Sequence, residues 1–530
     1  MDLNSFSKLM QLSPFEVKDA LIELASTHAD RMMLNAGRGN PNWVATEPRH
    51  GYWQLGRFAT EEAERFQGYM RQGVGGLPEK AGIVGRFDTF VQMHAGETGI
   101  EFLRACLAYV RDNLGHPGDE FLHEMACGII GCNYPVPDRM LELSEAICEE
   151  FITREMCRDV PVVGGIDLFA TEGGTAAMTY IFNTLHANRI LRPGDKVAIA
   201  RPIFTPYLEI PELEEYSLEQ VYIEADEEDG WQLPDAELEK LKDPAVKAFF
   251  LVNPSNPPAV QVGARARATI QSIIENDRPD LILLTDDVYG TFVDDFVSLF
   301  AICPHNTILV YSYSKYYGAT GWRLGLIALH KDNVLDKQLH ELPEADLDAL
   351  DKRYATLTLK PRELKMIDRF VADSRSVALN HTAGLSTPQQ VQMVLFSLFS
   401  LMDVQDAYMA EMKRLVRERL ATLYRAAGIT VELDPESSAY YTELTLDAIA
   451  SQLYTPDFVD WCKGELQPGE VLYRIADEAG VVLMPGSGFG DTRPSARVSL
   501  ANLNESDYAA IGKAIRHILD EYYERYQNRT

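Results

Sequence analysis

Short apolar runs alternate with amphipathic segments through the middle of the chain. The runs predict strands at 166–170, 196–201, 248–253, 281–285, 307–312 and 324–329. Between them, apolar positions recur at helical spacing, as in 175–187 and 264–276. Short strands separated by helical stretches are typical of a mostly parallel sheet that has helices on both faces. The pattern therefore predicts a large α/β domain.

The pattern changes after about residue 390. One long helical pattern covers 387–427, and a final helix is predicted from Glu505 to the end of the chain. Between these helices, alternating apolar and polar positions predict strands at 430–433, 439–444, 481–484 and 497–501. Mixed short strands and helices of this kind indicate a separate, smaller α+β domain.

Two segments carry no chemical motif. Residues 61–123 are helical and punctuated by glycines, and residues 331–373 are strongly charged, so both are interpreted as insertions into a common core. We therefore divide the chain into four parts: an N-terminal arm with part of the small domain (1–60), a helical insertion (61–130), a large domain that includes the charged insertion (131–380), and a small C-terminal domain (381–530).

Composition narrows the class of protein. The chain has 530 residues, 46% of them hydrophobic, which is enough for a large buried core. Its 49 basic and 79 acidic residues give a formal charge of −30, which argues against nucleic acid or an anionic membrane as the main partner. The seven cysteines include no CxxC pair, so free thiols in a reducing compartment are expected, and no metal site is predicted. Without a signal peptide or a long apolar run, we expect a soluble cytoplasmic protein.

The strongest chemical signal follows the predicted strand 307–312. Ser312 and Lys315 precede a glycine-rich turn and Arg323, in the pattern S-x-S-K-x-x-G-x-x-G-x-R-x-G. This segment resembles the lysine segment of fold-type I pyridoxal-phosphate (PLP) enzymes, the aspartate aminotransferase superfamily. The resemblance implies that Lys315 forms a Schiff base with PLP and then shuttles a proton. It also implies that Ser312 and Arg323 bind the cofactor, with Arg323 near its phosphate, and that 131–380 is the PLP-binding domain.

Other parts of such a site occur upstream in the order that the resemblance implies. Asp286 ends the predicted strand 281–285 and is expected to pair with the protonated pyridine nitrogen. Tyr289 is expected to donate to the phenolate oxygen O3′. Alone, a carboxylate at a strand end is more often a helix N-cap. The presence of Lys315 downstream favours the cofactor role, and Asp287 is given no role.

An N-P turn supplies a second expected partner for O3′. In Asn253-Pro-Ser-Asn256, the resemblance favours Asn256 as the donor, with Asn253 as the alternative register. Ala259 stands where the family usually has glycine.

Two segments near the predicted strands 166–170 and 196–201 complete the cofactor set. Gly173, Gly174 and Thr175 open a predicted helix, whose first backbone N–H groups suit a phosphate. Phe204 stands where the family places the aromatic ring that stacks on the pyridine, and a plain core position is its alternative.

Segments at both ends of the chain resemble the substrate side of the family's site. The resemblance implies that Arg497 holds the substrate α-carboxylate as a bidentate fork. Arg38 and Gly39 lie in a segment that resembles the substrate mouth. Tyr134 resembles the tyrosine that reaches the phosphate of the neighbouring subunit, so a homodimer with shared active sites is expected.

The two insertions make this chain longer than ordinary members of the superfamily. Together with the segments GRGNPNW, GGTAAM, PIFTPY and SYSKYYGATGWRLG, they resemble the bacterial L-aspartate 4-decarboxylase family. The resemblance implies conversion of L-aspartate to L-alanine and CO₂ through a ketimine and an enamine, with aminotransferase side activity, and assembly of dimers into a dodecamer. An aminotransferase for aspartate or another amino acid is the main alternative. Another PLP lyase and a non-enzymatic PLP-binding regulator are the others.

The partner of the distal carboxylate is open between two arginines. Arg38 is the first candidate and Arg375 the second, and a surface salt bridge is the alternative for either. A cation that clamped this carboxylate firmly would oppose decarboxylation, because it would stabilise the charge that is lost. A partly exposed cation is therefore expected.

Overall fold

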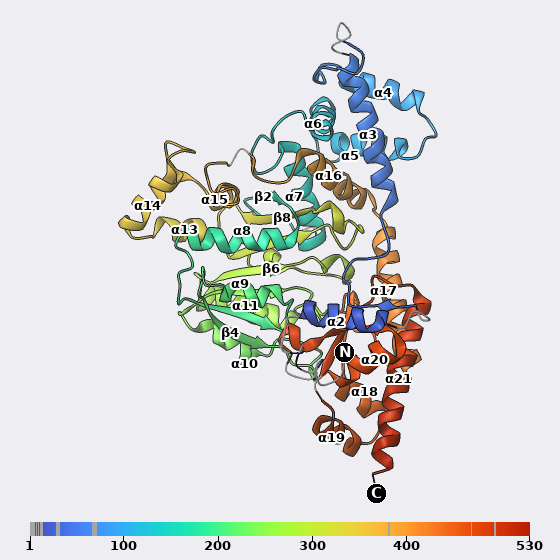
Figure 1. Cartoon of the computed structure of the whole chain (residues 1–530). Coiled ribbons are helices and arrows are strands. Elements are labelled where there is room, and N and C mark those ends of the chain that lie inside the picture. Colours follow the sequence, from blue (N-terminus) through green and yellow to red (C-terminus); the bar gives the residue numbers. More distant parts are fainter. Residues whose placement is uncertain are drawn as a thin grey trace.

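A seven-stranded mixed sheet lies at the centre of the computed structural model, with helices on both faces (Figure 1). The strand order is β2-β8-β7-β6-β5-β3-β4, in which β8 runs antiparallel to both neighbours and the other pairs are parallel. The bounds are β2 Ile166–Thr171, β3 Lys196–Arg201, β4 Glu219–Glu224, β5 Val246–Val252, β6 Ile282–Asp286, β7 Thr307–Ser312 and β8 Gly325–His330. The structure describes residues 6, 8, 10, 14–27, 32–65, 71–158, 160–379, 382–467, 469–491 and 494–529.

The strands are apolar along their length because helices cover both faces of the sheet. Along β5, Phe249 packs with residues of α11 and α12, whereas Phe250 packs into the larger core with residues of α8. The helices of this domain are α7 Glu142–Cys157, α8 Gly174–Ala187, α9 Pro206–Glu212, α10 Asp235–Leu238, α11 Ala264–Asn276 and α12 Leu299–Ile302. The α/β prediction is confirmed, and each predicted strand of this sheet is observed to within two residues at either end.

The helical insertion forms a unit at one end of the molecule, at the top of Figure 1. It consists of α3 Thr46–Arg65, α4 Ile83–Met93, α5 Ile100–Asp112 and α6 Gly118–Ile130. Gly51 lets α3 lie close to α5, since a Cβ there would stand 2.5 Å from a ring carbon of Phe102. The glycines of this segment thus serve helix packing as well as turns.

The helical pattern over 387–427 forms two helices, so the prediction of one was wrong. α16 Thr387–Met402 and α17 Ala407–Ala427 are separated by a turn in which Asp406 has a φ of 50°. α16 packs against α7, α3 and α6, whereas α17 packs along α21 Glu505–Gln527. We therefore propose that the small domain begins in this turn rather than at 381.

The small domain is built on the antiparallel sheet β11-β12-β9. Its elements are β9 Tyr441–Thr445, α18 Leu446–Leu453, α19 Pro456–Glu465, α20 Glu470–Ala479, β10 Val481–Val482, β11 Met484–Pro485 and β12 Ser495–Ser499. The strand predicted at 430–433 is absent from this described stretch, which is irregular. The N-terminal arm joins this domain, because β1 Leu34–Asn35 pairs in parallel with β10 and α2 Pro14–Ser26 packs on α20.

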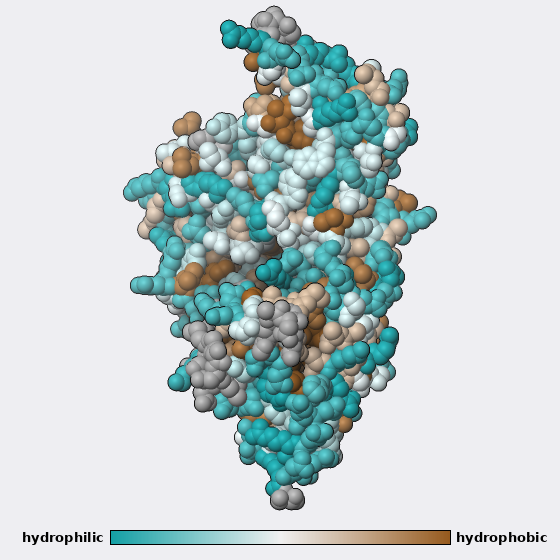
Figure 2. Space-filling view, turned by 45° about the vertical axis from the view of Figure 1, so that its right-hand side comes forward, coloured by the Kyte–Doolittle hydropathy of each residue, from teal (hydrophilic) through white to brown (hydrophobic). Residues whose placement is uncertain are grey.

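Hydrophobic side chains on the face shown in Figure 2 form small separate patches. No helix in the described part of the chain combines the length and apolar character needed to cross a membrane.

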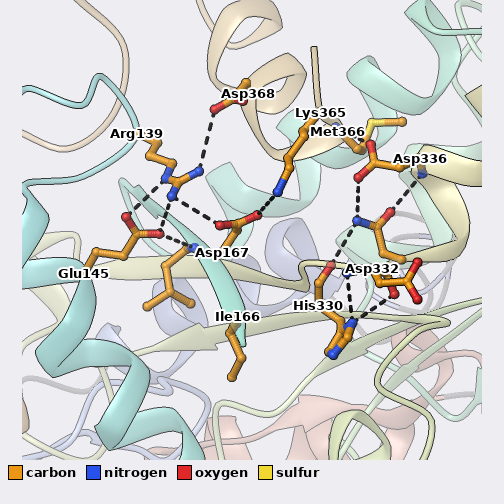
Figure 3. Close-up of polar contacts among 12 residues, drawn as sticks. Arg139, Glu145, Ile166, Asp167, His330, Asp332, Asp336, Lys365, Met366 and Asp368 are labelled. Atoms are coloured by element: carbon orange, nitrogen blue, oxygen red, sulfur yellow. Dashed lines mark hydrogen bonds and ion pairs between the residues drawn. The ribbon is translucent and has the colours of Figure 1, made fainter. Parts of the chain in front are cut away.

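Ion pairs tie the charged insertion to the sheet (Figure 3). This insertion carries α13 Val334–His340, α14 Glu344–Tyr354 and α15 Met366–Asp373. Arg139 lies 3.1 Å from Glu145, 3.2 Å from Asp167 on β2 and 3.8 Å from Asp368 on α15. Lys365 contacts the other oxygen of Asp167 at 3.3 Å. One mostly buried arginine therefore balances carboxylates from three segments.

We expect Arg139→Met to lower the stability of the large domain by about 3 kcal/mol, because it removes the cation beside the largely buried Glu145 and leaves only Lys365 beside Asp167 among the described residues. The melting temperature by calorimetry measures this effect. Arg362 is the matched control, since it also contacts three carboxylates but lies at the surface, where solvent screens its charge. The prediction would be contradicted if Arg139→Met had the same melting temperature as Arg362→Met and the wild type.

Candidate active site

A cavity of about 410 Å³ lies where the N-terminal arm, the central sheet and the small domain meet. Most of the residues expected to act together lie on its wall. They are Arg38, Gly39, Gly174, Thr175, Phe204, Asn256, Asp286, Tyr289, Ser312, Lys315, Arg323 and Arg497.

The direction of the strands explains this convergence. Asp286 and Ser312 are the last residues of the parallel strands β6 and β7, so both lie at the same edge of the sheet. β8 runs the opposite way, so its first residue, Gly325, and the preceding Arg323 lie at that edge too. Residues that are distant in sequence thus meet because their strands end or begin together.

Asp286 is a buried carboxylate on the cavity wall. It accepts hydrogen bonds from the Tyr207 hydroxyl at 2.7 Å and from the Val288 backbone N–H at 3.2 Å. Burial raises its pKa to about 6, although these bonds and the charge of Lys315 act to lower it. Asp287 does not line the cavity and accepts a hydrogen bond from Thr285. Asp286 is therefore the carboxylate placed to meet a cationic ligand.

Lys315 extends from the turn after β7 to the N-terminal arm. Its Nζ donates to the carbonyl oxygen of Gly39 at 3.0 Å, and the Tyr440 hydroxyl donates to the same oxygen at 2.9 Å. Within the turn, the Ser312 hydroxyl donates to Ser314 Oγ at 2.9 Å. These contacts hold a primary amine at a fixed point of the cavity.

The N-terminus of α8 and the Arg323 guanidinium lie together at one corner of the cavity. Gly173 precedes α8 with a φ of 92°, and no side chain caps this helix within the described residues. Arg323 Nη2 donates to the Glu172 carbonyl at 3.1 Å, and a Cβ on Gly173 would stand 2.5 Å from that nitrogen. Glycine at 173 therefore permits the arginine to lie against the helix N-terminus, where a phosphate is favoured.

Arg497 is a buried cation on the small-domain side. It is 3% exposed, and it donates to Asn256 Oδ1 at 3.1 Å and to the Gly37 carbonyl at 2.9 Å. Within the described part of the chain, no carboxylate pairs with it and its Nε has no partner. A buried charge without a counter-ion is costly, so this arginine suits an anionic ligand. Asn253, the residue of the alternative register, does not line the cavity, and its Oδ1 accepts a hydrogen bond from the Val262 N–H.

Three expected residues, Gly173, Arg375 and Tyr134, do not line this cavity. Arg375 forms an ion pair with Glu172 at 2.7 Å and donates to the Tyr180 hydroxyl at 3.1 Å. Tyr134 is 68% exposed on the segment after α6. Arg38 does line the cavity and is exposed, and it forms no ion pair or hydrogen bond within the described residues. Of the two candidate arginines, Arg38 is therefore the one at the cavity.

Sequence reasoning gave no role to several residues on the cavity wall, among them Lys18 on α2, Tyr207, Tyr441 on β9 and Met484 on β11. The motif PIFTPY contains Tyr207, but only the fold shows that it donates to Asp286. Tyr441 stands in a strand pattern that indicates a core position. Only the packing of the small domain on the sheet brings it to the cavity.

Comparison with known proteins identifies the family. The model of the family "Aminotransferase class I and II" matches residues 167–515. The chain belongs to the class I and II aminotransferase family. It is 57% identical over 522 residues, 98% of each chain, to a "Bifunctional aspartate aminotransferase and L-aspartate beta-decarboxylase" of a Pseudomonas species. It is also 32% identical over 199 residues to the aspartate aminotransferase of Rhizobium meliloti, covering 36% of this chain and 45% of that one.

Solved structures of this family share the fold. A double mutant of Thermus thermophilus aspartate aminotransferase superposes with a TM-score of 0.60 at 16% identity, covering 98% of this chain and 100% of that one. The expected fold-type I architecture is therefore confirmed.

Aminotransferases of this family depend on PLP, and the cavity fits that cofactor. The raised pKa of buried Asp286 suits a cationic ring nitrogen as its partner. The uncapped helix α8 and Arg323 suit a phosphate, and Lys315 offers an amine on the wall of the same cavity.

Asp286 gives a pH-dependent prediction for the cofactor-free protein. Because its folded pKa is about 6 and its unfolded pKa is near 4, the folded state binds more protons between these values. The protein therefore loses stability from this group as the pH rises from about 4 to 6. We expect Asp286→Asn to be more stable than the wild type at pH 7.5, by up to about 3 kcal/mol.

Melting temperatures of both cofactor-free proteins at pH 4 and pH 7.5 test this expectation. The difference should nearly vanish at pH 4, where Asp286 is protonated in the folded wild type and its unfolded form is only partly ionised. A variant less stable than the wild type at pH 7.5 would mean that burial does not control this group.

Proposed function

We propose that this protein is a PLP-dependent enzyme that removes the β-carboxyl group of L-aspartate to give L-alanine and CO₂, and that it also transaminates aspartate. The observation that carries this proposal is 57% identity across 98% of both chains to a relative named for both activities. The cavity supports it, because it combines an amine, a carboxylate and a buried guanidinium without a counter-ion.

The proposal includes the residues that would hold the cofactor. When bound, PLP supplies an electron sink that stabilises negative charge at substrate carbons. Asp286 would pair with its ring nitrogen, Tyr289 and Asn256 would donate to O3′, and Phe204 would stack on the ring. The phosphate would be held by Gly173, Gly174, Thr175, Ser312 and Arg323.

Arg497 and Lys315 would act at the amino-acid end of the substrate, the first as a cation and the second as an amine that takes up and returns a proton. Arg497 would bind the α-carboxylate, since its buried guanidinium has no carboxylate partner within the described residues. Lys315 Nζ, held by the Gly39 carbonyl at 3.0 Å, would move the proton at Cα. Gly39 thereby belongs to the substrate side of the site.

The two reactions separate at the distal carboxylate. If CO₂ leaves before water reaches Cα, the product is alanine; if water arrives first, oxaloacetate leaves. Arg38 stands exposed on the cavity wall and would meet this carboxylate at the mouth while limiting the entry of water. Arg375 is the weaker candidate, because Glu172 and Tyr180 already engage it.

The proposal extends to the assembly. Tyr134, exposed here, would complete the phosphate site of a second copy in a homodimer with shared active sites. The resemblance to the decarboxylase family adds assembly of dimers into a dodecamer. The seven cysteines are free thiols, which supports a cytoplasmic location.

Incubation with L-aspartate and PLP, without a keto acid, tests the proposed reaction. Catalytic formation of alanine and CO₂ is expected. A single turnover that yields oxaloacetate and then stops would favour the second candidate, an aminotransferase alone, which the shorter match to the Rhizobium enzyme also supports.

We expect Lys315→Ala to bind PLP but to lose turnover, because no amine remains to move the α-proton. Borohydride reduction followed by peptide mapping should place the cofactor on Lys315 in the wild type. Lys413→Ala is the matched control, since this lysine pairs with Asp294 away from the cavity. Cofactor mapped to another lysine would disprove the assignment.

We expect Arg38→Ala to change the ratio of alanine to oxaloacetate, because it opens the mouth to water and loosens the distal carboxylate. Product analysis with L-aspartate measures the ratio. Arg497→Ala should instead slow both reactions together through loss of α-carboxylate binding. If both rates fell while the ratio stayed unchanged, Arg38 would not control the competition between CO₂ loss and entry of water. Arg375 would then be the next candidate.

A further inference from the structure

Tyr441 is a buried phenol in the cavity to which the proposed function gives no role. It is the first residue of β9 and 3% exposed. Its hydroxyl accepts a hydrogen bond from the Tyr289 hydroxyl at 3.1 Å, and the Arg497 guanidinium lies 4.3 Å from the centre of its ring. The phenol therefore stands between an expected cofactor ligand and the expected α-carboxylate ligand.

Gly39 keeps the space in front of this hydroxyl open. A Cβ on residue 39 would collide with the Tyr441 hydroxyl oxygen and would lie 3.3 Å from Lys315 Nζ. The phenol and the amine therefore border the same small space. If Arg497 holds the substrate α-carboxylate, the reacting carbons lie in that space.

The surroundings make Tyr441 an acidic phenol. Burial by itself acts to raise its pKa, but the charges of Lys315 and Arg497 and the hydrogen bond from Tyr289 lower the pKa below the ordinary tyrosine value. The pKa values of Tyr289 and Tyr440 are raised instead, chiefly by burial. Of these three neighbours, Tyr441 is the best placed to release a proton.

β-Decarboxylation needs one proton transfer that transamination does not: Cβ must gain a proton after CO₂ has left. We propose that Tyr441 is the catalytic acid that supplies it, an inference that rests on the proposed function. The bond between Cβ and the distal carboxyl carbon breaks, and the bound substrate retains the electron pair. That pair then forms a C–H bond with the hydroxyl proton of Tyr441. Solvent restores the phenol, which accounts for the one proton consumed when aspartate becomes alanine.

The variant Tyr441→Phe separates the two reactions. We expect alanine formation to fall by at least about 100-fold, the usual scale for loss of a general acid. Oxaloacetate release in a single turnover should change by less than about threefold. Tyr424→Phe is the matched control, because it removes another phenol hydroxyl of the small domain, one that bonds to the Thr442 hydroxyl on β9 at 2.8 Å and does not line the cavity, and it should keep the ratio of the two products.

Ultraviolet difference titration of the cofactor-free protein gives a readout independent of turnover. One tyrosine should ionise at lower pH than the others in the wild type and in Tyr424→Phe, and this step should be missing in Tyr441→Phe. An unchanged titration in Tyr441→Phe, or a parallel loss of both products, would overturn the proposal. Absence of alanine with the wild-type enzyme would overturn the proposed function instead, so the two failures are distinguishable.

Discussion

The carbonyl oxygen of Gly39 joins three parts of the chain through two hydrogen bonds. Lys315 Nζ reaches it from the large domain, and the Tyr440 hydroxyl reaches it from the small domain. Glycine is required at this point because a Cβ would occupy the space beside Tyr441. One residue without a side chain therefore affects three features: the position of the amine, the width of the cavity and the packing of the small domain against it.

The same cavity holds charges that a folded protein normally avoids. Asp286 and Arg497 are both buried, and neither has an ion-pair partner of opposite charge within the described residues. Burial raises the pKa of Asp286, which shows that the interior disfavours its charge. The rigid strands β6 and β12 and the large apolar core support these groups. A cationic ring nitrogen beside Asp286 and an anionic substrate group beside Arg497 would relieve these two costs, so the features that bind ligands also oppose stability in their absence.

Much of the fold could be predicted, because local patterns encode it. Six strands of the large sheet were predicted, because they are apolar on both faces. β4 was not predicted, because Glu219–Glu224 is a partly exposed edge strand with polar ends. The break at Asp406 was missed because the apolar spacing continues through it. In the site, Asp286 and Lys315 stand in recognisable motifs. Tyr441 stands in no such motif, since its place in the cavity depends on packing between residues far apart in sequence. Arg375 forms an ion pair with Glu172 outside the cavity wall, and sequence spacing does not reveal that pairing.

The parallel pairing of β1 with β10 makes the small domain discontinuous in sequence. Residues 34 and 35 lie beside 481 and 482, and the side chain of Asn502 donates to the backbone carbonyl of Asn35 at 2.6 Å. A fragment cut out as 406–530 would therefore lack one of its own strands and expose the apolar edge of β10. The N-terminal arm also carries Arg38 and Gly39, so any rotation of the small domain moves the cavity mouth with it. A substitution at residue 34 or 35 therefore acts directly on the strand at residues 481 and 482, although more than four hundred residues separate them along the chain.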